Sequence, residues 1–275
     1  MLAGGQSLVP LLSMRLAAPS MLVDINGVPD LDQIRVDGAG VRVGALARHA
    51  DVLAHPDVGR VQPLVTLALA QVAHATIRNR GTTVGSLVHA DAAAEMPVVL
   101  KLLGGSVDVA STSGRRTIPA DDLFAGPLES TLTHDEIAVE AFFPALEVGA
   151  GVAFEEIARR HGDYALCGVA ALVRLAGEAI VEAKAGYLSV SDVPTVVDLT
   201  ASLSSGLTEE ALAAAGDAAL SELDPADDIH ATADYRAQLV RVLTARVVRS
   251  AYESVLAGTP QVPSTATTNG EGTHA

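Results

Sequence analysis

Short apolar runs, separated by Gly, Pro, Asn and Asp, fill much of the first half of the chain and predict strands there. Residues 21–26 predict a buried strand that the turn signal Asn26-Gly27 closes. Two further runs flank Asp37-Gly38-Ala39-Gly40 and predict a hairpin. The predicted strands of this half are residues 21–26, 34–36, 41–44, 106–110, 115–118 and 137–143.

Two other stretches of the same half have apolar residues at helical spacing. An Ala-rich segment from Leu64 to Val72 predicts a helix that ends near His74. Residues 97–103 predict a second helix, because Pro97 suits the first turn of a helix.

The pattern changes at residues 144–151, where Pro, Gly and Ala interrupt it and predict a domain break. Strands are expected at residues 152–157, 166–175 and 179–187, followed by helices at 209–220 and 231–256. Strands followed by helices are typical of an α+β domain with helices on one face of an antiparallel sheet. The sequence therefore predicts an α+β fold with domains at residues 1–147 and 151–257, and a disordered tail over residues 258–275.

Acidic residues outnumber basic ones, since 33 Asp and Glu against 18 Lys and Arg give a formal net charge of −15. Such a charge repels nucleic-acid phosphates and anionic lipid surfaces. No apolar run approaches the roughly 20 residues of a membrane span, and the N-terminus lacks the pattern of a secretion signal. We therefore expect a cytoplasmic protein that binds neither nucleic acid nor membrane.

Cys167 is the only cysteine of the chain. One thiol cannot form an internal disulfide, hold an iron–sulfur cluster by itself or build a cysteine-based zinc site. We therefore predict no metal site in this chain, and any redox metal would lie in another chain.

Paired glycines near the start of the chain supply the first candidate chemistry. In Ala3-Gly4-Gly5-Gln6-Ser7 they let the backbone bend sharply and present consecutive N–H groups to an anion, and a helix beginning after Ser7 would direct its positive end to the same place. The segment matches neither the Walker A pattern nor the dinucleotide pattern G-x-G-x-x-G. It predicts either a phosphate cradle of another kind or an ordinary turn.

A second stretch rich in small and hydroxyl residues covers residues 78–91, and Glu95 follows it. Its small residues let the main chain approach a ligand closely and add short donors for phosphate oxygens; they are Gly81, Thr82, Gly85 and Ser86. Asp91 or Glu95 is a candidate acceptor for ribose hydroxyls. The alternatives are that Asp91 caps a turn or helix and that Glu95 is a solvated acid in a first helical turn.

These two segments and a third resemble the FAD-binding medium subunit of the molybdenum hydroxylases, the family of carbon monoxide dehydrogenase and xanthine dehydrogenase. That family carries A-G-G-[QH]-S-L before a helix, then I-R-N-R-G-T-[IV]-G-G-[SN]-L-A-H-[AG]-D-P-A-[AN]-[ED], then R-R-x-G-D-[FYW]-A. The matching segments are residues 3–8, 77–95 and 159–165. Three motifs in this order are specific, and the resemblance covers nearly the whole chain before the tail.

The resemblance implies a two-part FAD-binding domain of the molybdopterin-dehydrogenase (PCMH) type before the C-terminal α+β domain, with FAD bound non-covalently. It implies that the FAD pyrophosphate is held by two sets of residues: Ala3, Gly4, Gly5, Gln6 and Ser7, and Thr82, Thr83, Val84, Gly85 and Ser86. Asp91 and Glu95 would complete the cofactor site, with Glu95 on the adenosine ribose. Tyr164 would lie near the isoalloxazine or serve as a packing aromatic. No residue is expected to act as a catalytic acid or base, and His74 and His89 are expected to fix loops by hydrogen bonds.

The same resemblance implies a subunit of an FAD-dependent oxidoreductase. It would receive electrons from the [2Fe–2S] clusters of a small subunit, which takes them from a molybdenum–pterin cofactor in a large subunit, and pass them to an external acceptor. The complex is expected to be a dimer of heterotrimers. The single cysteine agrees with this scheme, because the chain cannot hold those clusters itself.

Two departures from the family pattern leave alternatives open. Val84 stands where the family usually has glycine, at a position where unusual backbone geometry is expected, and this would weaken FAD binding. Met1 falls inside the first motif, so we expect the preceding helix and strand of the family to be missing. The alternatives are therefore a truncated scaffold subunit without FAD and a stand-alone flavin oxidase. The segment after Gly151 offers no His/Tyr/Arg constellation of the kind that a substrate domain would carry.

Overall fold

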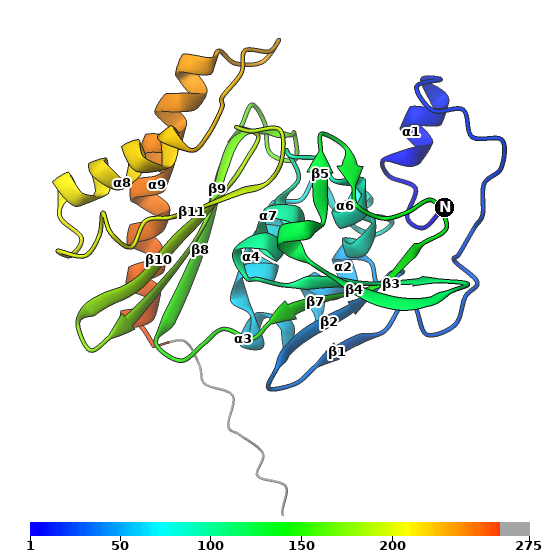
Figure 1. Cartoon of the computed structure of the whole chain (residues 1–275), viewed down its shortest axis with the longest axis horizontal. Helices are drawn as coiled ribbons and strands as arrows, with labels where there is room; N and C mark the ends of the chain where they lie inside the picture. The colour runs from blue at the N-terminus through cyan, green and yellow to red at the C-terminus, as the bar shows by residue number, and fades with distance from the viewer. Residues whose placement is uncertain (259–275) are drawn as a thin grey trace, which may run out of the picture.

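Two antiparallel sheets organise the chain, which the computed structural model describes over residues 1–258 (Figure 1). The first sheet has the strand order β1-β2-β7-β3-β4 and the second the order β11-β10-β9-β8, while β5 and β6 form a separate ribbon. The strands are β1 (Ile34–Val36), β2 (Gly40–Gly44), β3 (Ser106–Ser111), β4 (Gly114–Pro119), β5 (Phe124–Gly126), β6 (Glu129–Ser130), β7 (Ile137–Pro144), β8 (Ala150–Ala158), β9 (Ala165–Ala176), β10 (Ala179–Leu188) and β11 (Thr195–Asp198).

Helices lie between the two sheets and cover the outer face of the second one, while α1 stands apart from both sheets (Figure 1). They are α1 (Leu8–Ser13), α2 (His49–Ala54), α3 (Val58–Val61), α4 (Pro63–Gln71), α5 (Ala75–Arg78), α6 (Thr83–His89), α7 (Glu95–Leu102), α8 (Glu209–Ser221) and α9 (Ala233–Leu256), with the 3-10 turn η1 (Ala120–Asp122). Helices α4 and α7 pack on the inner face of the second sheet, and α8 and α9 lie on its outer side (Figure 1).

The first core shows why the hairpin prediction is confirmed. Val41 and Val43 of β2 are fully buried, and the pairing places Ile34 opposite Val43. The turn is fixed by Asp37, whose Oδ1 accepts the backbone N–H of Ala39 at 2.8 Å. This arrangement is an Asx turn.

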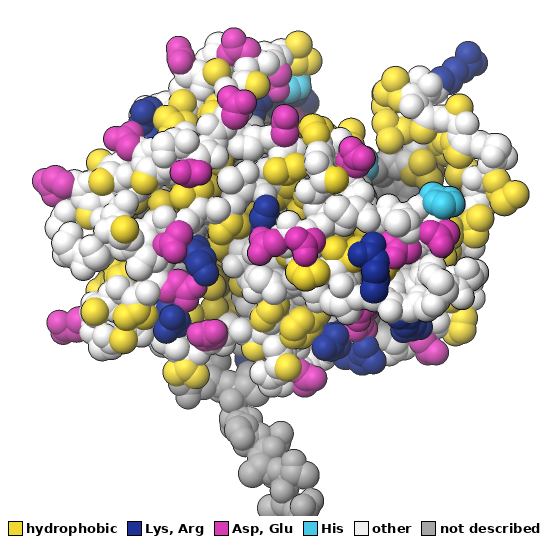
Figure 2. All heavy atoms as spheres, viewed as in Figure 1, with side chains coloured by type: hydrophobic (Ala, Val, Ile, Leu, Met, Phe, Trp, Pro, Cys, Tyr) yellow, Lys and Arg dark blue, Asp and Glu magenta, His cyan; other side chains and the backbone are white. Residues whose placement is uncertain are grey.

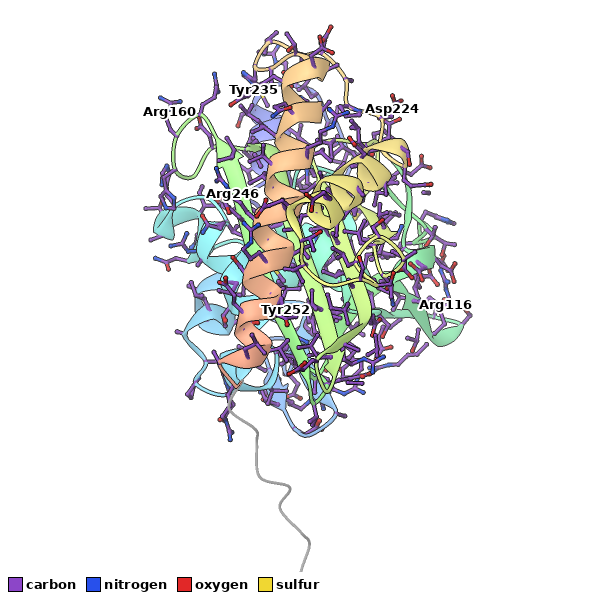
Figure 3. The ribbon with its side chains drawn as sticks, turned by 90° about the vertical axis from the view of Figure 1, so that its left-hand side faces the viewer. Arg116, Arg160, Asp224, Tyr235, Arg246 and Tyr252 are labelled. Atoms are coloured by element: carbon purple, nitrogen blue, oxygen red, sulfur yellow. The ribbon has the colours of Figure 1, made fainter. Side chains whose placement is uncertain are left out.

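The second sheet is buried on both faces, because side chains of its strands alternate between two cores. Ala170 and Leu188 contribute to the core shared with α4 and α7, whereas Val169 and Tyr187 contribute to the core under α8 and α9. The Tyr187 hydroxyl lies 2.8 Å from Oγ1 of Thr244 on α9. Seen from the side, α9 runs along this sheet (Figure 3). The predicted antiparallel sheet with helices on one face is confirmed, and helices of the first half cover its other face.

The strand predicted at residues 21–26 is wrong. In this segment only Ile25 is buried, and a single bridge pairs Asp24 with Leu2. The apolar residues Met21, Leu22 and Val23 are exposed, so the composition that predicted a buried strand has no core to enter here. Helix α6 lies within the second glycine-rich stretch, where no helix was predicted. The tail prediction falls almost wholly on residues 259–275, outside the described residues.

Acidic side chains are scattered over the face shown in Figure 2, in keeping with the net charge of −15. Among residues 1–258, no helix combines the length and the apolar character that crossing a bilayer requires.

Candidate functional site

A cavity of about 560 Å³ opens where the N-terminal segment meets α6 and the start of α7. Its lining includes the loop at residues 3–7, the second glycine stretch at residues 81–86, Asp91, Glu95 and the loop at residues 162–164. Three segments that are far apart in the sequence therefore converge on one cavity, in the size range of small-molecule and cofactor sites. These are the three segments that carry the family motifs.

The first glycine loop lies directly against the second. A Cβ on Gly4 would stand 2.3 Å from the backbone oxygen of Arg80 and 2.9 Å from Cα of Gly81. Gly5 has φ +75°, a conformation that favours glycine. Within the described chain, the backbone N–H groups from Gly4 to Ser7 donate to no other protein group. They are therefore available to an anion in the cavity.

The second glycine stretch forms the first turn of α6. Thr82 is its N-cap, and its Oγ1 accepts the N–H of Gly85 at 3.2 Å. A Cβ on Gly85 would lie 2.4 Å from that hydroxyl oxygen, so glycine leaves room for this rotamer of Thr82. Val84 lies in the helix with an ordinary negative φ. The expected unusual backbone geometry at Val84 is therefore absent, and this reason for weakened FAD binding is removed.

Thr83 does not line the cavity, although sequence reasoning grouped it with the residues that do. Its side chain is fully buried, and its Oγ1 lies 3.2 Å from Nδ1 of His49. His49 does line the cavity and is 4% exposed. Burial, and then the charge of Arg78, lower the pKa of His49 to about 4. Sequence reasoning missed His49, because a lone histidine after a short strand carries no motif.

The two acids of the site lie beside Tyr164. Asp91 forms a turn in which its Oδ1 accepts the N–H of Ala93 at 2.9 Å, so the capping alternative is confirmed for this residue. Glu95 begins α7 but is not solvated: burial, and then the charge of Asp91, raise its pKa to about 7. Partial burial, then Asp91 and Glu95, raise the pKa of Tyr164, whose side chain is 71% exposed at the cavity. All three residues line the cavity, and the charges of the two acids reach the Tyr164 hydroxyl.

A further acid stands behind Glu95, on β8 of the second sheet. Glu156 lies opposite Gly168, and a Cβ on Gly168 would come within 3.1 Å of the Glu156 side chain. Oε2 of Glu156 is buried without a hydrogen-bond partner. Burial, and then the charge of Glu95, raise the pKa of Glu156 to about 8. Two carboxyl groups from the two parts of the chain therefore titrate close to neutral pH instead of near pH 4.5.

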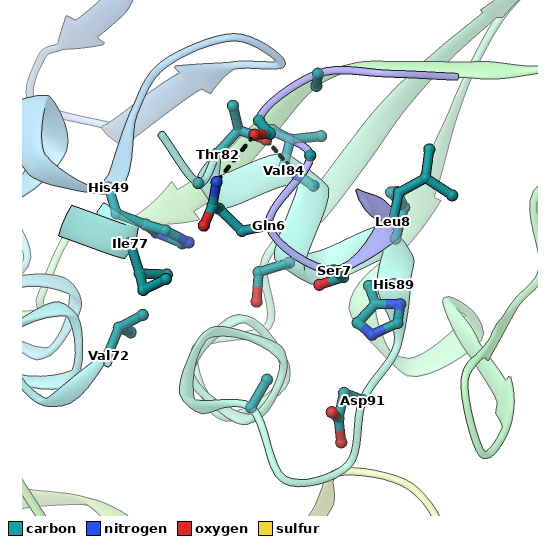
Figure 4. A pocket seen from close by; sticks show the side chains of 18 of the residues that line it. Gln6, Ser7, Leu8, His49, Val72, Ile77, Thr82, Val84, His89 and Asp91 are labelled. Carbon is teal, nitrogen blue, oxygen red and sulfur yellow. Dashed lines mark hydrogen bonds between the residues drawn. The ribbon is translucent and has the colours of Figure 1, made fainter. Parts of the chain in front are cut away.

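The histidines expected to fix loops behave differently. Among the described residues, no hydrogen bond involves the ring of His74 or His89. The His74 ring instead packs on the loop after β8, because a Cβ on Gly162 would lie 2.5 Å from its Cε1. His89 lines the cavity. Figure 4 shows His49 and Gln6 on one side of this cavity and His89 and Asp91 on another.

The fold and the cavity define a two-part class of protein, in which two glycine loops and the loop between β8 and β9 of an antiparallel sheet line one cavity of cofactor size. Two family models match the chain: the FAD binding domain in molybdopterin dehydrogenase over residues 1–146, and the CO dehydrogenase flavoprotein C-terminal domain over residues 152–251. The chain belongs to this family of FAD-dependent oxidoreductase subunits, the medium chains of molybdenum hydroxylases.

Relatives with named activities resemble the chain along most of its length. The 6-hydroxypseudooxynicotine dehydrogenase complex subunit alpha of Paenarthrobacter nicotinovorans is 41% identical over 255 residues, which cover 91% of this chain and 86% of that protein. The carbon monoxide dehydrogenase medium chain of Hydrogenophaga pseudoflava is 33% identical, covering 92% and 88%. A chain of quinoline 2-oxidoreductase from Pseudomonas putida 86 superimposes with a TM-score of 0.86 at 36% identity, covering 93% and 90%.

The residues of the cavity fit FAD. Its pyrophosphate needs donors, and the backbone amides of residues 4–7 line the cavity without a protein acceptor among the described residues. Its hydroxyl groups need acceptors and its rings need apolar walls, and the lining includes both kinds of residue: the acids Asp91 and Glu95, and the apolar Val72 and Ile77. The cavity thus offers each chemical group of FAD a matching surface.

Proposed function

We propose that this chain is the electron-transferring FAD subunit of a heteromeric molybdenum hydroxylase. It accepts electrons from the [2Fe–2S] clusters of a small subunit, which takes them from the molybdenum cofactor of a large subunit, and passes them to an external acceptor. The observation that carries the proposal is the cavity between the two glycine loops, with its row of free backbone amides. Bound FAD supplies the redox chemistry.

The composition of the chain supports this division of labour. Its only cysteine, Cys167, is buried, and burial raises the pKa of its thiol to about 12. Across residues 1–258, no three His, Cys, Asp or Glu side chains are grouped so that they hold a metal ion. The proposal accordingly assigns electron transfer in this chain to FAD.

Two roles suggested by the family resemblance compete at one end of the cavity. Glu95 was expected on the adenosine ribose and Tyr164 near the isoalloxazine, yet both residues line the cavity and the charge of Glu95 raises the pKa of Tyr164, so the two side chains interact. In an extended FAD these two groups lie at opposite ends of the molecule. We therefore assign this end to the flavin and place Glu95 against the ribityl hydroxyls, which adjoin the ring and need the same kind of acceptor. The exposed face of Tyr164 is then available to stack on the ring.

The two glycine loops have defined tasks in this assignment. The amides of residues 4–7 bind the pyrophosphate, and the Thr82 cap keeps the first turn of α6 in register with them. The proposal expects small and large subunits as partners, in a dimer of heterotrimers, and a cytoplasmic location.

Co-expression of the chain with its small and large subunits tests the proposal. The purified complex should show a flavin absorption band that bleaches when a substrate of the large subunit is added, together with the iron–sulfur signal. The substrate panel should start with those named for the relatives, 6-hydroxypseudooxynicotine and carbon monoxide. A complex that assembles without flavin would instead support the scaffold alternative. A single chain that oxidises a small alcohol or amine by itself would support the stand-alone oxidase.

A further inference from the structure

His49 is the buried polar side chain of the cavity whose chemistry is not yet assigned. It begins α2, and its backbone is tied to the second glycine stretch: its N–H donates to the oxygen of Gly81 at 3.0 Å, and Arg48 pairs with Thr82 in a bridge. Residues 47–49 therefore move with the phosphate-facing loop. The position of the His49 ring is fixed from both its backbone and its side chain.

The ring lies where the two glycine loops meet. A Cβ on Gly81 would stand 3.0 Å from Cδ2 and 3.5 Å from Nε2 of His49, and Gly81 itself lies against Gly4. In Figure 4 the ring extends toward Gln6 of the first loop. Nε2 thus faces the part of the cavity that the free amides of residues 4–7 also face.

The hydrogen bond to Thr83 determines which ring nitrogen carries the proton. Within the described residues, the Thr83 hydroxyl has one partner, Nδ1 of His49. If Nδ1 carried the hydrogen, the fully buried hydroxyl would have no acceptor for its own proton, at a cost of about 1–3 kcal/mol. The hydroxyl therefore donates to Nδ1. A neutral imidazole has one N–H, so that N–H is at Nε2.

From this geometry we infer that His49 is a cofactor-contacting residue that donates its Nε2–H to the FAD pyrophosphate, and that Thr83 is the positioning residue that sets its tautomer. The inference rests on the proposed function, since it names a further donor in the same site. Burial and Arg78 keep the ring neutral at physiological pH, so the donor is present without a second charge on the ring. It also explains why Thr83 sits behind the cavity wall rather than in it.

Binding measurements on the full-length chain test this role. In His49→Phe, which keeps a ring but has no donor, the dissociation constant for FAD should rise about 10- to 100-fold, the worth of one hydrogen bond to a charged group. His49→Gln is the matched control, because its amide can accept from Thr83 and donate into the cavity; its affinity should stay within about threefold of the wild type. ADP, which keeps the pyrophosphate, should lose affinity for His49→Phe by the same factor. Riboflavin, which lacks the pyrophosphate, should not.

A spectroscopic measurement separates this role from mere packing. Long-range ¹H–¹⁵N correlation of the histidine ring should report the Nε2–H tautomer for His49 in the wild type and in Thr83→Ser, and its loss in Thr83→Val. Thr83→Val should also weaken FAD binding when it is introduced alone. Added to His49→Phe, it should have no further effect, because the threonine acts through the histidine ring.

The outcomes are distinct. If the wild-type chain does not bind FAD, the proposed function is overturned. If the wild type and His49→Phe bind FAD with equal affinity, only the role of His49 is overturned. If His49→Phe fails to fold, the tautomer decides: an Nδ1–H signal in the wild type overturns the inference, and an Nε2–H signal supports it.

Discussion

Gly4→Ala is the substitution for which the geometry makes the sharpest prediction. The added Cβ would stand 2.3 Å from the backbone oxygen of Arg80, where ordinary contacts begin at 3.4 Å. The neighbour is backbone, so no side chain can rotate away, and the two glycine loops must separate by about 1 Å. Two hydrogen bonds from the loop amides to a phosphate would then be stretched beyond normal length, a loss of about 3 kcal/mol or more. The dissociation constant for FAD should therefore rise at least about 100-fold.

The same substitution should leave the folded chain almost as stable as before. Helix α1 has no buried residue, and between Met1 and Gln33 only Ile25 is buried, so the first loop can shift without disturbing a core. We expect the unfolding midpoint of the apoprotein to move by no more than about 2 °C. Fluorescence titration with FAD and a thermal melt measure the two quantities. Gly27→Ala is the matched control, since its Cβ meets nothing within 4 Å and should change neither. Wild-type FAD affinity in Gly4→Ala would refute the reasoning.

Three further predictions address stability and reactivity. The raised pKa values of Glu95 and Glu156, about 7 and 8, mean that the folded chain holds protons that the unfolded chain releases above about pH 4.5. The free energy of unfolding should thus fall as pH rises from about 5 to 8, by roughly 2–4 kcal/mol after allowance for solvent screening. Urea titrations at several pH values should show that the double variant Glu95→Gln, Glu156→Gln lacks this dependence of the unfolding free energy on pH. An equal pH dependence in the wild type and the variant would contradict the prediction. Cys167 should not react with a thiol reagent at pH 8 in the native chain, and one thiol per chain should react in denaturant. Rapid labelling of the native chain would contradict the burial of Cys167. Arg236→Met should lower the free energy of unfolding by about 2–4 kcal/mol, because the buried carbonyl of Leu166 and the partly buried carbonyl of Ser189 lose their donor. Asp228→Asn, at the exposed end of the same ion pair, should lower the free energy of unfolding by at most about 1 kcal/mol. An equal loss in both variants would show that the ion pair, and not the bonds to the carbonyls, stabilises this region.

Local patterns sufficed to predict most of the second half of the chain. The strands β8, β9 and β10 and the helix α9 follow from long apolar runs with clear turns between them, because each element packs against its sequence neighbours. The segment at residues 21–26 shows the limit of this reasoning. Its composition suits a buried strand, but burial depends on partners that the sequence pattern does not place, and only Ile25 finds a core.

The glycine motifs predicted the loops that line the cavity, yet they could not predict which residues from other segments pack against these loops. Thr83 belongs to the motif but turns away from the cavity, whereas His49 lies outside every motif and lines it. His49 lines the cavity in place of Thr83 because residues 47–49 pair with residues 81–83, although the two segments are more than 30 positions apart in the sequence. Glu156 is a similar case, because its neighbour Glu95 comes from the other part of the chain. Since the pairing with residues 47–49 holds the second glycine loop in place, we expect the affinity for FAD to depend on residues, such as His49, that no motif contains.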